Sequence, residues 1–234
     1  MLFRSVVHNL TAMYSIGLFY GEDGKLDMFR HRTNPLTMPL QAIAADILGL
    51  SYTEIKPRIP QPTTELDSKQ VTIAIHSTAQ AKYWNNPDGW QQIVDWLKSK
   101  GYTVKLLSSE GLDYMGNKAP EGVVLHPNSS LEDVMVELKK SKMFIGISSG
   151  LSWLSWALNV PTAIISGFTD PISEMESCSR ISAPKNKCSG CWSRHKFNPG
   201  DWNWCPDHKG TPRQFECSRE ITSDTVIREL EKML

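Results

Sequence analysis

The segment FIGISSGLSWLSWALNVP, Phe144–Pro161, decides the fold class of this chain. It begins with an apolar run typical of a fully buried strand. The small residues Ser148-Ser149-Gly150 then form a turn, and apolar side chains at helical spacing follow from Leu151. Another apolar run starts at Pro161. A buried strand, a tight turn, a helix and a second buried strand make the repeating unit of a parallel sheet.

The same alternation continues upstream of this segment. Residues 71–76, 102–107 and 123–125 are predicted strands, and residues 88–100 and 131–140 are predicted helices. Ser130 and Asp133 form a capping box at the start of the second helix. This order predicts an α/β fold, namely a Rossmann-like doubly wound parallel sheet.

The first 60 residues show little periodicity. Gly17–Tyr20 looks like a strand, and a helix is expected from Leu40 up to Gly49. The stretch PRIPQPTT, residues 57–64, holds three prolines in eight residues and predicts a linker. We therefore expect a separate segment over 1–60, and a sheet domain over 61–234 that includes a cysteine-rich segment over 171–220.

Composition excludes several classes of protein. The chain has 25 basic and 25 acidic residues, and this neutrality argues against nucleic-acid or anionic-membrane binding. No apolar run approaches the roughly 18 residues of a transmembrane helix. The first 20 residues contain Arg4, His8 and Asn9 and lack a signal-peptide pattern, so we expect a cytoplasmic protein.

Four of the five cysteines have the spacing of a metal site. Cys188 and Cys191 form a CxxC pair, and Cys205 and Cys217 follow it in a loop-rich region. Four thiolates complete a tetrahedral site for zinc or iron. Cys178, ten residues before the pair, is interpreted as a spare. Free cysteines and a redox CxxC remain the alternatives.

Two strand ends predict a phosphate site. Ser148, Ser149, Gly150 and Leu151 join a buried strand to a helix, whose first N–H groups and dipole favour an anion. Lys82 follows the strand at 71–76 and would meet a phosphate as a point charge. The alternatives are an ordinary strand–turn–helix joint and a solvated lysine over apolar stems.

Two further residues are candidates for the same site. Trp84 follows Lys82 closely and would pack beneath the ligand. Asp170, in Thr169-Asp170-Pro171, follows the strand at 161–165 and would accept hydrogen bonds from sugar hydroxyls. An Asp-Pro pair also simply initiates turns.

Three long segments, taken together, resemble the bacterial heptosyltransferases over about residues 17–234. They are AKYWNNPDGWQQIVDWLKSKGYTVKLLSS, FIGISSGLSWLSWALNVPTAIISGFTDP and CSGCW…WCP…GTPRQFECSREIT. The third is similar to the four-cysteine insertion of the autotransporter O-heptosyltransferases, which glycosylate serines of surface adhesins. Ordinary lipopolysaccharide heptosyltransferases lack this insertion.

The resemblance implies a GT-B fold in which the C-terminal half binds the nucleotide sugar, ADP-heptose or a relative. It implies inverting transfer of heptose to a Ser of an adhesin or autotransporter-type acceptor protein, without a catalytic metal. One structural metal ion is implied at the four cysteines, iron in this branch although zinc also fits. A homo-oligomer, built in part by the insertion, is implied as well.

The resemblance also predicts a missing part. The family's N-terminal domain carries a glycine-rich loop and an aspartate that acts as general base, and neither is recognisable here. Asp27 lies beside Arg30-His31-Arg32, but it is not assigned as the base, so no catalytic residue is predicted. We expect an N-terminally truncated chain, either a fragment or half of a split enzyme. The competing function is a non-catalytic module for nucleotide-sugar binding or oligomerisation.

Overall fold

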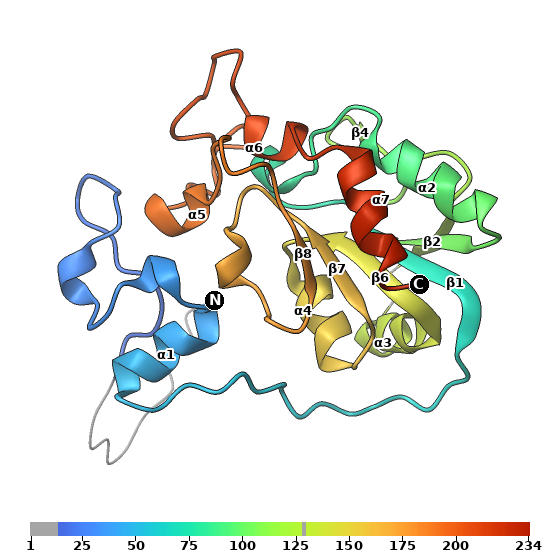
Figure 1. Cartoon of the computed structure of the whole chain (residues 1–234), viewed down its shortest axis with the longest axis horizontal. Helices are drawn as coiled ribbons and strands as arrows, with labels where there is room; N and C mark the ends of the chain where they lie inside the picture. The colour runs from blue at the N-terminus through green and yellow to red at the C-terminus, as the bar shows by residue number, and fades with distance from the viewer. Residues whose placement is uncertain (1–13, 128–129) are drawn as a thin grey trace.

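The computed structural model describes residues 14–127 and 130–234. Its centre is a parallel sheet in the order β5-β2-β1-β6-β7-β8, beside a small antiparallel β3-β4 hairpin (Figure 1). The predicted α/β, doubly wound fold is confirmed. The strands are β1 Asp67–Ala74, β2 Thr103–Ser108, β3 Asp113–Tyr114, β4 Asn117–Lys118, β5 Val124–Pro127, β6 Ser141–Ile147, β7 Thr162–Ile165 and β8 Ser179–Ile181.

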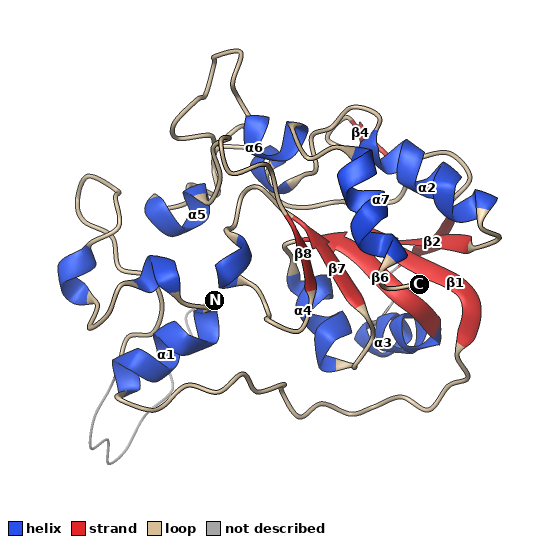
Figure 2. Cartoon of the chain, in the orientation of Figure 1, coloured by secondary structure: helices blue, strands red, loops and turns tan. Residues whose placement is uncertain are grey.

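Helices cover both faces of the sheet (Figure 2). Helices α2 and α7 pack together on one face, and α3 and α4 pack together on the other. The α-helices are α1 Leu40–Leu48, α2 Gly89–Ser99, α3 Leu131–Lys140, α4 Gly150–Ala157, α5 Cys191–Arg194, α6 Glu216–Arg219 and α7 Ser223–Glu231. Single-turn 3₁₀ helices are η1 Met28–Arg30, η2 Pro35–Thr37, η3 Gln80–Lys82 and η4 Pro171–Ser173.

The apolar pattern of the sequence explains both layers. Ile93 and Leu97 of α2 and Leu230 of α7 are fully buried against one face of the sheet. Leu138 of α3 and Phe144 of β6 are fully buried on the other face. A sheet covered on both sides needs strands that are apolar throughout, as β6 nearly is.

Strand order determines where a ligand can bind. From β1 the chain moves outward through β2 to the edge strand β5, and then returns to β6 on the other side of β1. The connections after β1 and β6 therefore leave the sheet in opposite directions. A crevice opens at such a switch point, at the carboxyl ends of the two strands.

Two sets of hydrogen bonds attach the N-terminal region to the sheet domain, and η2 also contacts η4. An extended stretch over residues 51–66 runs along the domain (Figure 1), where Lys56 Nζ donates to Asn159 Oδ1 at 2.8 Å. Further away, Leu26 N donates to Arg194 O at 2.9 Å and Lys196 N to Gly24 O at 2.7 Å. The boundary predicted at residue 60 falls within the extended stretch and stays a prediction.

Local predictions in this part have mixed outcomes. Helix α1 ends at a left-handed Gly49, as expected. The strand expected at Gly17–Tyr20 is wrong. Of these residues only Tyr20 forms a β-bridge, to Leu26, and a second isolated bridge joins Lys25 to His195. The first part of the segment predicted over 1–60 lies outside the described residues, as do Arg4, His8 and Asn9. Among the helices that the structure describes, none is both long and apolar enough to cross a membrane.

Candidate functional site

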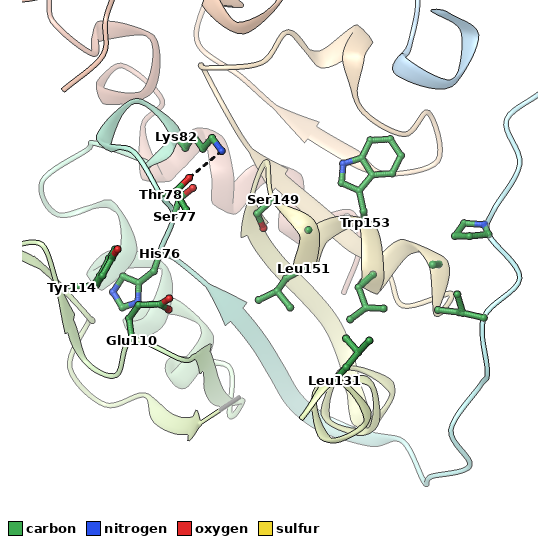
Figure 3. A pocket seen from close by; sticks show the side chains of 15 residues that line it. His76, Ser77, Thr78, Lys82, Glu110, Tyr114, Leu131, Ser149, Leu151 and Trp153 are labelled. Atoms are coloured by element: carbon green, nitrogen blue, oxygen red, sulfur yellow. Dashed lines mark hydrogen bonds between the residues drawn. The ribbon is translucent and has the colours of Figure 1, made fainter. Parts of the chain in front are cut away.

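A cavity of about 720 Å³ lies at the switch point between β1 and β6 (Figure 3). The loop after β1 supplies one wall, and the start of α4 supplies the opposite one. Leu131 of α3 and the extended stretch, through Pro57 and Ile59, close the remaining side. The volume is within the range of small-molecule sites.

The start of α4 gives the cavity an anion-binding surface. Ser149, Gly150 and Leu151 line the wall, and the helix begins at Gly150. Ser152 N already donates to Ser149 O at 3.1 Å, and no side chain caps the helix at Ser149, so the N–H groups of Gly150 and Leu151 remain for an anion. These N–H groups and the positive end of the helix dipole together favour a phosphate.

Ser148 has a different position from its neighbours. Its hydroxyl donates to Glu174 Oε1 at 2.5 Å, and Ser148 does not line the cavity. Glu174 is buried and also accepts from Thr169 Oγ1 at 2.6 Å. Of the four residues predicted at this turn, Ser148 is the one that does not line the cavity.

Lys82 lies on the wall of the cavity across from Ser149 (Figure 3). Its Nζ donates to Thr78 Oγ1 at 3.4 Å and lies over the rings of Phe168 and Phe197. Burial lowers the pKa of Lys82 from its ordinary value. No carboxylate of the described residues forms an ion pair with it. The cavity thus contains a cation without a protein anion beside it.

The rest of the cavity is divided into an apolar and a polar side. Leu131, Leu151 and Trp153 form the apolar side, and Leu131 is 61% exposed although it is a large apolar residue. An occupant with a flat apolar surface, such as a nucleobase, would bury these side chains. Opposite them lie Glu110 and Tyr114 (Figure 3).

A hydrogen-bond chain fixes the polar side. His76 Nε2 lies 3.2 Å from Asn117 O, and because a carbonyl only accepts, Nε2 carries the proton in the neutral ring. Nδ1 then accepts from Ser108 Oγ at 2.9 Å. Ser108 Oγ in turn accepts from the backbone N–H of Glu110 at 3.1 Å. These bonds tie the ends of β1 and β2 to the hairpin that carries Tyr114.

Two predicted ligand residues do not line the cavity. Trp84 is 4% exposed, and its indole Nε1 donates to Ile221 O at 2.9 Å in the core. Asp170 accepts from Ser189 Oγ at 3.1 Å, and its carboxylate lies directly against Gly190. Trp84 is a large apolar side chain that fills the core behind η3, and Asp170 is turned toward the cysteine-rich segment.

The four predicted cysteines come together away from the cavity. Cys188 accepts a hydrogen bond from Cys217, which lowers the pKa of Cys188 to about 7. The same hydrogen bond and burial raise the pKa of Cys217, and Cys188, Cys191 and Cys205 all contribute to that rise. Cys178 packs elsewhere, against Trp156, and burial raises its pKa to about 12.

The chemistry of this donor set fits a soft metal ion. Cys191, Cys205 and Cys217 are buried, and their thiols with Cys188 supply the ligands that zinc or iron prefers. Burial raises the pKa of Cys191 to about 12, and the charge of Arg194, whose Nη2 lies 3.6 Å from Cys191 Sγ, acts in the opposite direction.

A second set of potential donors lies at the edge of the cysteines. One donor atom each of Cys188, His208 and Glu216 lies within 4.8 Å of the others. Glu216 is already paired with Arg213 and accepts from Cys188 N at 3.2 Å. The assignment of all four thiols as ligands stays a prediction, and Cys188 is common to both sets.

Known proteins resemble this chain over most of its length. The model of glycosyltransferase family 9 (heptosyltransferase) matches residues 41–196. The autotransporter heptosyltransferase Aah of Escherichia coli is 38% identical over 92% of this chain and 56% of its own length. The inactive autotransporter heptosyltransferase BimC of Burkholderia thailandensis is 30% identical over 93% of this chain and 52% of its own length.

A solved structure has the same fold. It is the dodecameric iron-containing heptosyltransferase TibC of Escherichia coli in complex with ADP-D-beta-D-heptose. It superposes with a TM-score of 0.78 at 35% identity, and the match covers 94% of this chain and 58% of that one. The chain spans little more than half the length of these relatives. The match over residues 41–196 shows that the chain belongs to glycosyltransferase family 9, the heptosyltransferases.

Proposed function

We propose that this chain is the donor-binding half of an inverting O-heptosyltransferase. It binds ADP-heptose, or a related nucleotide sugar, for transfer to a Ser of an adhesin or autotransporter-type protein. Residues 61–234 form the nucleotide-sugar domain, and residues 1–60 belong to the acceptor side. The observation that carries this proposal is one cavity that combines a phosphate surface at the start of α4 with an apolar surface formed by Leu131 and side chains of α4.

The ligand's three parts match three parts of the wall. The diphosphate lies at Ser149, Gly150 and Leu151 with Lys82 opposite. The base packs against Leu131 and the apolar residues of α4. Glu110 supplies the carboxylate that lines the cavity. It accepts hydrogen bonds from the hydroxyl groups of the sugar.

This arrangement serves the chemistry of sugar transfer. When the bond between the sugar and the diphosphate breaks, negative charge grows on the leaving phosphate. The helix N–H groups and Lys82 are already oriented toward that charge, so they stabilise the transition state more than the ground state. The general base is assigned to no residue of this chain.

The four cysteines hold one structural metal ion in this proposal. TibC is described as iron-containing, which favours iron over zinc. Four thiolates fill a tetrahedral shell and leave no open position for a substrate. TibC is also described as dodecameric, which supports a homo-oligomer here. Reduced thiolate ligands suit the cytoplasm.

One observation favours a second candidate function. A relative named as inactive is 30% identical over 93% of this chain. A non-catalytic module that binds a nucleotide sugar, or that assembles, is therefore compatible with the same fold.

Calorimetry with ADP, followed by a transfer assay with ADP-heptose and an autotransporter acceptor, tests both functions. Binding together with transfer supports the enzyme. Binding without transfer is the result for the non-catalytic module and also for a donor-binding half that supplies no general base, so only positive transfer separates the two. If the parent chain fails to bind ADP, the cavity is not a nucleotide site and the proposal is wrong.

A further inference from the structure

Three aromatic rings connect the cysteine site to the cavity. The rings of Phe168, Phe197 and Trp204 form a closed group, with centroids 5.3–5.7 Å apart. Phe168 and Trp204 pack with Cys191 in one apolar cluster, and Trp204 directly precedes Cys205. The metal-site cysteines and the rings are thus one packed unit.

Lys82 lies on this unit. Its Nζ is 5.3 Å from the ring centroid of Phe197 and 5.8 Å from that of Phe168. The cysteine-rich segment contacts the neighbours of Lys82 as well. Gln80 N donates to Trp202 O at 2.9 Å, and the ring of Trp202 packs edge-on against Tyr83. The position of η3, and of its lysine, therefore depends on residues 197–202.

The aromatic support suits a phosphate-binding lysine. A carboxylate beside Lys82 would neutralise it and would compete with the phosphate. A ring face attracts the ammonium through its quadrupole and leaves the charge unpaired. The only hydrogen bond that the described residues give this ammonium is the 3.4 Å contact with Thr78. The rings are consequently its main electrostatic partners before a ligand arrives.

We propose that Phe197, which the cysteine-rich segment carries, is a positioning residue for Lys82 in phosphate binding. This inference rests on the proposed nucleotide site. Phe168 follows β7 and belongs to the sheet domain, whereas Phe197 comes from the segment between the second and third cysteines. The segment thereby completes the phosphate site in addition to holding a metal.

Calorimetry on the intact chain with two probes tests the role. Phe197→Leu keeps an apolar side chain but removes the ring, and should weaken ADP binding about three- to tenfold. Adenosine lacks the phosphates, so its affinity should be unchanged. Phe197→Tyr keeps the ring face and should bind ADP like the parent. Phe215→Leu is the matched control, because Phe215 packs in the same cluster but not over Lys82.

A double-mutant cycle separates positioning from general loosening. In a Lys82→Ala background the change Phe197→Leu should cost no further ADP affinity. An equal loss in that background, or an equal loss in Phe215→Leu, overturns the inference. So does a Phe197→Leu variant that binds ADP as tightly as the parent.

A spectroscopic signature tests the contact without nucleotide. The side-chain methylene protons of Lys82 next to Nζ should show an upfield ring-current shift in NMR spectra, and Phe197→Leu should remove most of it. If the parent shows no such shift, the role of Phe197 is wrong, and the proposed nucleotide site is unaffected. A present shift in a parent that does not bind ADP overturns the proposed function and, with it, the role in phosphate binding.

Discussion

The hydroxyl of Ser148 lies 2.5 Å from the buried carboxylate of Glu174, and Ser148 does not line the cavity that Ser149 and Gly150 line. Thr169 donates to the same carboxylate oxygen. One side chain thus joins the ends of β6 and β7. These hydrogen bonds fix the turn that carries Ser149 and Gly150.

Ser148→Ala should therefore lower stability and weaken phosphate binding together. It leaves a buried carboxylate with one donor fewer, which costs about 1–3 kcal/mol. Denaturant unfolding and ADP calorimetry measure the two effects. Ser148→Thr, which keeps a hydroxyl, should restore both. Equal free energies of unfolding for Ser148→Ala and the parent would show that this hydrogen bond does not contribute to stability.

Lys82→Ala should weaken ADP binding by about ten- to a hundredfold, because a charge-assisted hydrogen bond contributes about 1.5–3 kcal/mol. Lys69→Ala is the matched control. Lys69 lies near the start of β1, whereas Lys82 is in η3 after the end of that strand, and Lys69 also lies over an aromatic ring, that of Tyr102. Calorimetry on both variants checks the prediction, and similar ADP affinities for the two would contradict it.

The metal assignment predicts the outcome of five substitutions. The parent should bind about one equivalent of metal. Cys188→Ser, Cys191→Ser, Cys205→Ser and Cys217→Ser should each lose it, and Cys178→Ser should keep it. Elemental analysis measures the metal, and size-exclusion mass measures assembly. A metal-free parent that is fully folded would refute the structural role.

Loss of the metal should also loosen the segment around the cysteines. Residues 182–222 contain only two single-turn helices, α5 and α6, so ligand bonds replace much of the packing that a sheet would provide. Trp192, Trp202 and Trp204 lie in this segment, and their fluorescence should change when a chelator removes the metal. The four serine variants should resemble the chelated parent.

The segment should also be sensitive to acid. The hydrogen bond from Arg213 holds the pKa of Glu216 at about 2, below the ordinary 4.5. A lowered pKa contributes stability that is present above pH 4.5 and is lost as the pH falls toward 2. Glu216→Gln should remove this part of the dependence. An acid titration of tryptophan fluorescence measures it, and superimposable curves for the variant and the parent would contradict the assignment.

The sheet could be predicted because it leaves a local signal, and the cysteine site remains a prediction that rests on a signal of the same kind. Buried strands such as β6 are mostly apolar, and the apolar residues of the helices that follow them recur every three to four residues. Thiolate ligands are few in kind, so the spacing of Cys188 and Cys191 already indicates a site. In both cases the residues that give the signal lie close together in the sequence.

The cavity was harder to predict because irregular loops assemble it. Periodicity does not determine whether Ser148 or Ser149 faces the ligand, and Trp84 and Asp170 point elsewhere. His76 and Glu110 were missed, although both closely follow a strand on the edge where ligands bind. Ile59 reaches the wall from a segment far from it in sequence, and no local pattern reports such a contact.

The double attachment of the N-terminal region has a mechanical consequence. A body joined to its neighbour by one extended tether can swivel about it freely. Here residues 24–26 are also hydrogen-bonded to residues 194–196, so the region has a second anchor. Swivelling about the tether requires that this anchor break or that the cysteine-rich segment move too. While both anchors hold, the region moves only together with the cysteine-rich segment that carries Phe197.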